Sequence, residues 1–268
     1  MRKLILVLFI LLSCASLANA GGIISFPGGG VPSAKNYTDD PNCQAAWLFA
    51  DNLNDSSGQG NTLSTNGTWS YETTRPNSLT SGKSIHFDGS SGYLSIATGD
   101  QNAAFVGKQD KTDVAYCFWL YRDNDASAAE SVFFIEDFRA TVTYVSAWNQ
   151  MEAYFSDTEF TNLEQLIDSD VEPATWLHYC VSFAGADPTS TTTRWISTES
   201  SFGDVYNGTT LDYTNIKDVD GSINTFYVGR NSTTLYLDGW IYQLIIFDRT
   251  ISATEAEEMY TTGIDGGG

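Results

Sequence analysis

Basic residues are scarce in this chain. Its 268 residues include 13 Lys and Arg against 33 Asp and Glu, which gives a formal net charge of −20 at pH 7. A surface this acidic repels the phosphates of nucleic acids and of anionic lipids, so neither is an expected partner. The acids are scattered rather than gathered into a tail. Their excess fits cation binding, a saline habitat or plain solubility.

Long apolar runs are also lacking. No segment reaches the roughly 18 consecutive apolar residues that a membrane-spanning helix needs. The shorter run Leu4–Leu12 follows two basic residues and precedes Ala18-Asn19-Ala20, a small-x-small cleavage sequence. This order predicts an export signal over residues 1–20 and a secreted or periplasmic mature chain. Leu11–Cys14 also fits a loose lipobox, so a lipid anchor on Cys14 is the competing expectation.

The motifs of several enzyme classes are missing. The sequence has two histidines and contains no Gly-x-Ser-x-Gly elbow, no Cys/His metal spacing and no phosphate-cradling glycine loop. Glycoside hydrolases need two carboxylates on one face. Adjacent Glu136-Asp137 point to opposite faces, Asp157-Thr158-Glu159 lacks a third acid, and Asp218-Val219-Asp220 lies in an expected turn. We therefore predict no catalytic activity, with glycoside hydrolysis as the main enzymatic alternative.

Short strand-like segments dominate what is present. Apolar and aromatic side chains alternate over Val114–Tyr121 and over Trp176–Phe183, and turn residues separate such segments. One good helical segment occurs, near the end, where Ser252 and Glu255 have the spacing of a capping box. The pattern predicts an all-β fold: an antiparallel two-sheet jelly-roll sandwich with a short C-terminal helix.

The same pattern divides the chain. Residues 21–42 are rich in glycine, proline and serine, which predicts a flexible lead-in. Residues 43–263 have the length of one all-β domain. Residues 264–268 end in three glycines and predict a loose tail.

Cysteine pairing is left open by the sequence. Cys14 lies in the expected signal, so Cys43, Cys117 and Cys180 remain, an odd number in an oxidising compartment. Cys117 and Cys180 both lie in expected strands and are the favoured pair, although Cys43 could pair with either. Three small buried hydrophobic residues, with no bond between them, are the competing interpretation.

Six segments follow one another in an order that a known family shares. They are Trp47-Leu48-Phe49 with Asp55–Asn61, His86-Phe87-Asp88-Gly89 with Tyr93-Leu94, Tyr116–Leu120, Trp176–Gly185, Phe226–Gly229 and Gly239–Tyr260. Together they resemble the laminin-G-like domains of the concanavalin A-like lectin and glucanase superfamily. The resemblance spans nearly all of residues 43–262 and implies the jelly-roll fold. Because lectins, adhesion modules and hydrolases share this fold, the resemblance says less about function.

Calcium is the ligand that this resemblance implies, because many relatives hold one ion at the sandwich rim through loop oxygens. The loop after the first strand offers Asp51, Asp55 and Asn61, and Asp238 precedes the closing strand, which neighbours the first strand in this family. The acid that relatives often carry inside the closing strand is Tyr242 here. A loop held by Asx turns without an ion is the competing interpretation.

Carbohydrate binding would use aromatic side chains, because the C–H faces of sugars stack on aromatic rings. Trp47, Trp119, Trp176 and Trp240 lie in the strongest strand motifs and are assigned to the core. The remaining candidates lie in weaker strands or loops: Trp148, Tyr154, Trp195, Tyr206, Tyr213 and Tyr236. Packing within the protein is the competing interpretation for each.

We therefore expect an exported, non-catalytic module that binds carbohydrate or a cell or particle surface, with calcium as its one expected cofactor. A structural or adhesive component of a surface or virion is the competing expectation. The sequence gives no indication of the oligomeric state.

Overall fold

The computed structural model describes residues 34–97, 113–123, 129–135, 140–145, 150–156, 163–169, 173–184, 191–210, 225–231 and 234–267. Contacts divide the chain into two units, Met1–Ser33 and Ala34–Gly268. The first unit, with the expected export signal, lies outside the described residues. Within the second unit, Tyr37 and Ile264 are both buried, and the Tyr37 N–H donates a hydrogen bond to the Ile264 carbonyl at 2.8 Å. Part of the expected lead-in and part of the expected tail therefore pack on the domain.

Strands make up most of the described residues. In chain order the elements are η1 (Tyr37–Asp39), β1 (Cys43–Trp47), β2 (Ser64–Asn66), β3 (Trp69–Glu72), β4 (Ser84–Asp88), β5 (Tyr93–Ala97), β6 (Val114–Arg122), β7 (Glu130–Ile135), β8 (Ala140–Val145), β9 (Gln150–Ser156), β10 (Leu163–Ser169), β11 (Trp176–Phe183), β12 (Thr191–Thr198), β13 (Ser201–Thr210), β14 (Thr225–Val228), β15 (Asp238–Phe247) and α1 (Ala253–Thr262).

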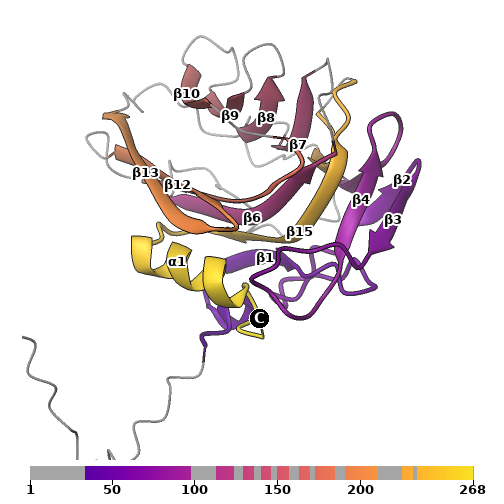
Figure 1. Cartoon of the computed structure of the whole chain (residues 1–268), viewed down its shortest axis with the longest axis horizontal. Coiled ribbons are helices and arrows are strands. Elements are labelled where there is room, and N and C mark those ends of the chain that lie inside the picture. Colours follow the sequence, from indigo (N-terminus) through magenta and orange to yellow (C-terminus); the bar gives the residue numbers. More distant parts are fainter. Residues whose placement is uncertain are drawn as a thin grey trace, which may run out of the picture. The chain divides into compact units, whose positions relative to one another are not determined.

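These strands form two antiparallel sheets (Figure 1). The eight-stranded sheet has the order β13-β12-β11-β6-β15-β4-β3, and β1 also pairs with β15. The seven-stranded sheet has the order β10-β9-β8-β7-β14-β5-β2. The predicted fold class, an all-β two-sheet sandwich with one short C-terminal helix, is confirmed. Among the described residues, no helix is both long and apolar enough to cross a bilayer.

Strand β15 joins several parts of the eight-stranded sheet. One edge pairs with β6 along most of its length. The other edge pairs first with β4, over Asp238–Ile241, and then with β1, over Leu244–Phe247. Between these two stretches lies Gln243, whose φ of 55° coincides with a register shift. The bulge lets one strand serve two neighbours on the same edge.

The core fills the space between the sheets. On β6, Tyr116, Phe118 and Leu120 point inward and are buried, as the alternation in the sequence predicts. Phe133 of the seven-stranded sheet packs edge-on against Tyr116, with ring centroids 4.7 Å apart. Trp47 on β1 stacks on Phe226 of the seven-stranded sheet, with ring centroids 5.4 Å apart. Each such buried aromatic side chain contributes about 2–3 kcal/mol through apolar burial.

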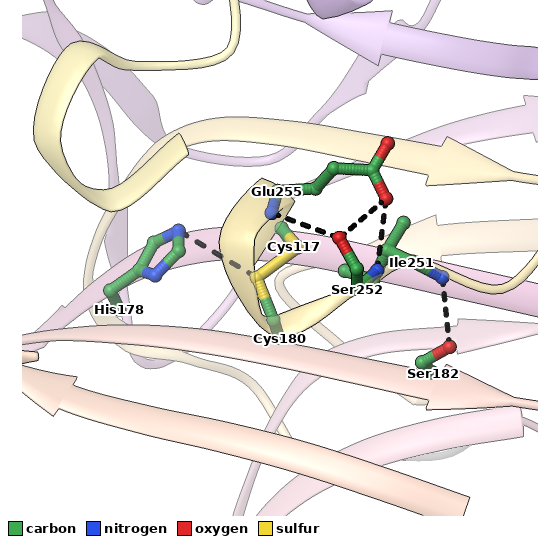
Figure 2. Close-up of a disulfide and its surroundings, with 7 residues drawn as sticks. All are labelled: Cys117, His178, Cys180, Ser182, Ile251, Ser252 and Glu255. Carbon is green, nitrogen blue, oxygen red and sulfur yellow. Dashed lines mark hydrogen bonds between the residues drawn. A yellow bond between two sulfur atoms is a disulfide. The ribbon is translucent and has the colours of Figure 1, made fainter. Parts of the chain in front are cut away.

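Helix α1 packs on the outer face of the eight-stranded sheet, the face turned away from the other sheet (Figure 1). Ala256 and Met259 lie in one buried cluster with Cys117 and Cys180. The capping box forms as predicted: the Ser252 hydroxyl accepts a hydrogen bond from the Glu255 N–H at 3.2 Å, and the Glu255 carboxylate accepts one from the Ser252 N–H at 2.9 Å (Figure 2). These bonds satisfy backbone N–H groups that helix formation leaves unpaired.

A disulfide bond joins Cys117 and Cys180 beneath the start of this helix (Figure 2). The two residues lie directly opposite each other on β6 and β11, with their Cα atoms 4.2 Å apart. Nearby, the Ile251 N–H donates a hydrogen bond to the Ser182 hydroxyl at 3.0 Å, which fixes the chain entering α1 to β11. Cys43 is a buried free thiol in the same cluster.

Replacement of both Cys117 and Cys180 by alanine is expected to lower the free energy of unfolding by about 4 kcal/mol. The bond joins residues 63 positions apart and so restricts the unfolded chain. Its removal raises the conformational entropy of the unfolded state and thereby destabilises the folded one. Urea denaturation of the double variant measures the loss. The matched control is Cys43→Ala, which removes a buried sulfur without a crosslink and should cost about 1 kcal/mol. Equal losses in the two proteins would contradict the prediction.

Candidate functional site

The acids considered for glycoside hydrolysis fall outside the part of the chain that the structure describes: Glu136, Asp137, Asp157, Glu159, Asp218 and Asp220. His178 is described, and it is fully buried beside the rings of Trp119 and Tyr260. Burial lowers the pKa of His178 to about 3. Its imidazole is therefore neutral at physiological pH and packs as part of the outer cluster under α1.

The loop after β1 is organised around Asp55. One carboxylate oxygen accepts hydrogen bonds from the N–H groups of Ala46 at 3.0 Å and Ser57 at 2.9 Å, and from the Ser57 hydroxyl at 2.7 Å. The other accepts one from the Asn61 N–H at 2.9 Å. Asn61 is fully buried, and its amide donates to the Gln44 carbonyl at 2.7 Å. Protein donors thus surround Asp55, as in the Asx-turn interpretation of this loop.

The other two acids of the predicted calcium set make different contacts. Asp51 pairs with the Lys83 amine at 2.6 Å. Asp238 begins β15, where it forms a group with His86 and Asp123. The acidic group that contains Asp238 includes neither Asp51 nor Asp55. Among the described residues, these four side chains do not form one cluster of possible ligands. The calcium site over Asp51, Asp55, Asn61 and Asp238 therefore stays a prediction.

The predicted sugar-binding aromatics separate into three groups. Trp148 and Tyr213 lie outside the described residues, as do the side chains of Tyr154 on β9 and Tyr206 on β13. Trp195 is only 3% exposed and packs in the cluster under α1, so no ring face is available for a sugar and its assignment changes to packing. Tyr236 is half-buried and lies beside Tyr93.

Tyr236 belongs to a cluster of half-buried side chains, here called the tyrosine–arginine patch, formed by Tyr93, Tyr227, Arg230 and Tyr236. The Arg230 guanidinium carbon lies 4.3 Å from the ring centroid of Tyr93, 4.8 Å from that of Tyr227 and 5.6 Å from that of Tyr236. Tyr93 also contacts Tyr227 edge-on at 5.8 Å. Such cation–π contacts hold the rings in a fixed arrangement.

Strand alternation explains why the patch is on the outside. Tyr93 on β5 lies next to buried Leu94, and Tyr227 on β14 lies between buried Phe226 and Val228, which face the core. Tyr93 and Tyr227 therefore point to the outer face of the seven-stranded sheet. Half-buried Ser95 on β5 pairs with Tyr227 in register and adds a hydroxyl to this face.

Arg230 and Tyr236 come together outside the named strands. The two residues form an isolated antiparallel bridge. Arg230 Nε donates to the Asn231 carbonyl at 2.7 Å, and the Asn231 side chain accepts from the Leu235 N–H at 3.1 Å. Of these four residues only Tyr236 was predicted from the sequence, although the alternation around Tyr93 and Tyr227 indicated that both face outward.

A second group of accessible aromatics lies on the outer face of the eight-stranded sheet. Trp240, assigned to the core from the sequence, is half-buried there because Ile241 takes the inward position. The Trp240 ring stacks on His86 at 4.3 Å and meets Tyr121 edge-on at 5.2 Å. Burial and the negative charge of Asp123 raise the pKa of the neighbouring Asp238.

Comparison with known proteins identifies the fold. No family model matches the sequence, and no curated protein matches it. Among solved structures, domain 4 of an extracellular GH43 arabinanase from Geobacillus stearothermophilus, in complex with arabinotriose, matches with a TM-score of 0.57 at 14% identity. The match covers 82% of this chain and 98% of that domain.

Receptor-binding domains of botulinum neurotoxins also match. The C/D mosaic domain has a TM-score of 0.61 at 12% identity over 82% of this chain. A type C structure, whose toxin depends on interaction with two ganglioside molecules for cell entry, has a TM-score of 0.61 at 14% identity over 84% of this chain. This chain spans about half the length of each toxin domain, 51% in both cases. At these identities the likeness shows a shared β-sandwich fold.

Replacement of Asp55 by alanine is expected to lower the free energy of unfolding by about 3 kcal/mol in the presence of a chelator, because several charge-assisted hydrogen bonds are lost together. Urea denaturation with EDTA and with calcium measures the loss, and Asp39→Ala, at an exposed acid, is the control. A loss that occurs only in calcium would contradict the prediction and support an ion in this loop.

Proposed function

We propose that the protein is a non-catalytic carbohydrate-binding module of the laminin-G-like type, exported from the cell, whose ligand contacts the tyrosine–arginine patch. One observation carries the proposal: three half-buried tyrosines surround a single guanidinium on an outer sheet face. Half-buried aromatic rings held rigidly are well suited to binding, because little conformational entropy is lost when a ligand packs on them.

The chemistry of the patch suits a sugar. Tyrosine rings offer apolar faces to sugar C–H groups, and their hydroxyls exchange hydrogen bonds with sugar hydroxyls. Arg230 adds N–H donors and a positive charge in a chain whose formal net charge is −20. The patch therefore favours a glycan with several hydroxyls or with an acidic group.

The structural neighbours support a binding role. The arabinanase domain was solved with arabinotriose, and cell entry of the type C toxin depends on interaction with two ganglioside molecules. These ligands belong to those proteins and not to this chain.

The tyrosine–arginine patch predicts which substitutions abolish binding. A glycan array that includes arabinan and ganglioside oligosaccharides would identify the ligand. Tyr93→Ala and Tyr227→Ala should each weaken binding of that glycan at least tenfold, since each removes one stacking surface. Calorimetry measures the affinities, and thermal melts check that the variants are folded.

The matched control is Tyr121→Ala, a half-buried tyrosine on the outer face of the other sheet. Its glycan affinity should equal that of the original protein. Loss of affinity in Tyr121→Ala alone would move the binding site to the Trp240 side. An array without any hits would reject carbohydrate binding and favour a structural or adhesive component.

Glycoside hydrolysis remains a second candidate because of one pair of acids. A carboxylate oxygen of Asp123 and one of Asp238 lie within 4.8 Å of each other, close to half-buried Trp240. Retaining glycosidases place their two carboxyl groups about 5–5.5 Å apart. This candidate predicts release of reducing sugar from the array ligand, lost by at least a thousandfold in Asp123→Asn. No turnover by the original protein would reject it.

A further inference from the structure

Three side chains of types that can ligate a metal meet on the neighbouring strands β4, β15 and β6, where β15 begins and β6 ends. Here they are called the rim cluster: His86 on β4, Asp123 directly after β6, and Asp238 at the start of β15. One potential ligand atom from each lies within 4.8 Å of the other two. The backbone fixes the arrangement, because the Asp123 N–H donates to the Asp238 carbonyl at 3.1 Å and β4 pairs with β15 at this point.

Within the part of the chain that the structure describes, Nε2 of His86 and the carboxylates of the rim cluster make no hydrogen bond. Nε2 of His86 is buried and makes no hydrogen bond within the described part of the chain. The carboxylates of Asp123 and Asp238 likewise have no hydrogen-bond donor or ion-pair partner among the described residues. Partly buried polar groups are normally paired, but Nε2 of His86 and the half-buried carboxylate of Asp238 meet without a partner, beside the exposed carboxylate of Asp123. A cation would pair with all three.

Arg122 offsets the negative charge of these acids only in part. Arg122, the nearest basic residue in the sequence, is buried and pairs with Glu130 at 3.2 Å. Asp88, opposite Asp238 in register, adds a further negative charge, although its carboxylate accepts bonds from the N–H groups of Ser90, Ser91 and Gly92. A cation between Asp123 and Asp238 would offset the repulsion of these acids.

The ligand types select the kind of cation. Calcium and magnesium prefer oxygen ligands only, whereas an imidazole with two carboxylates suits a first-row transition metal such as zinc. Ligand atoms about 2.0–2.2 Å from zinc lie no more than about 4.4 Å from one another. Asp123 is exposed, so its side chain needs to move only slightly to close the cluster.

We propose that His86, Asp123 and Asp238 bind one divalent transition-metal ion, with zinc as the reference metal and at least one coordination position left open to solvent. This site is distinct from the sugar-binding patch proposed above, with which it shares no residue, and from the predicted calcium loop, with which it shares only Asp238.

Titration calorimetry of the whole protein, dialysed against a chelator and then freed of it, tests this site with zinc chloride alone. We expect one zinc ion per chain. Asp123→Asn keeps the shape of an exposed side chain while removing its charge, and His86→Phe keeps a ring against Trp240 while removing the nitrogen ligand. Each variant should bind zinc at least tenfold more weakly.

The control variant is Asp51→Asn, which changes an exposed acid of the predicted calcium loop and should bind zinc as the original protein does. Thermal melts without metal establish that each variant is folded. The proposal is overturned if no zinc binds, if both rim variants bind zinc normally, or if equimolar calcium displaces the zinc. Because the glycan test uses Tyr93 and Tyr227, failure of either proposal leaves the other standing.

Discussion

The register of β15 is the constraint on which the rest of the structure depends. This strand is bonded to β6 on one edge and to β4 and β1 on the other, so three separate parts of the sequence are aligned against it. The bulge at Gln243 allows the change of neighbour. It is stabilised locally, because the Gln243 side chain accepts from the Ile264 N–H at 3.0 Å and donates to Asp265 at 3.3 Å.

The register of β15 also determines which of its side chains face outward on the eight-stranded sheet. Beyond the bulge, Ile245 and Phe247 face outward and are covered together with α1, in the cluster that holds the disulfide. Before the bulge, Trp240 faces outward and stays half-buried beside the rim cluster. Helix α1 covers the end of this sheet face beyond the bulge and leaves Trp240 at the other end half-buried. The tyrosine–arginine patch arises on the other sheet by plain alternation.

The fold could be predicted because its signals are local. Alternation in β6 and β11, turn residues between strands and the capping box at Ser252 each depend on a few neighbouring residues. The candidate sites depend on contacts between distant segments, which no local pattern records. Tyr236 was identified, yet Tyr93 joins it only through the pairing of β5 with β14. Trp240 was assigned to the core because an apolar run does not show which residues face inward.

Whether an acidic side chain can bind an ion depends on the protein groups that already pair with its carboxylate. Asp55 and Asp88 accept several backbone hydrogen bonds, which for Asp88 hold the pKa below its usual value although burial acts to raise it. Glu130 has Arg122. The Asp55 and Asp88 carboxylates already accept several bonds and Glu130 is ion-paired, so an ion would have to compete with protein groups for them. Asp123 and Asp238 differ because strand pairing places them together without a donor, and sequence position alone does not distinguish them from the other acids of an acidic chain.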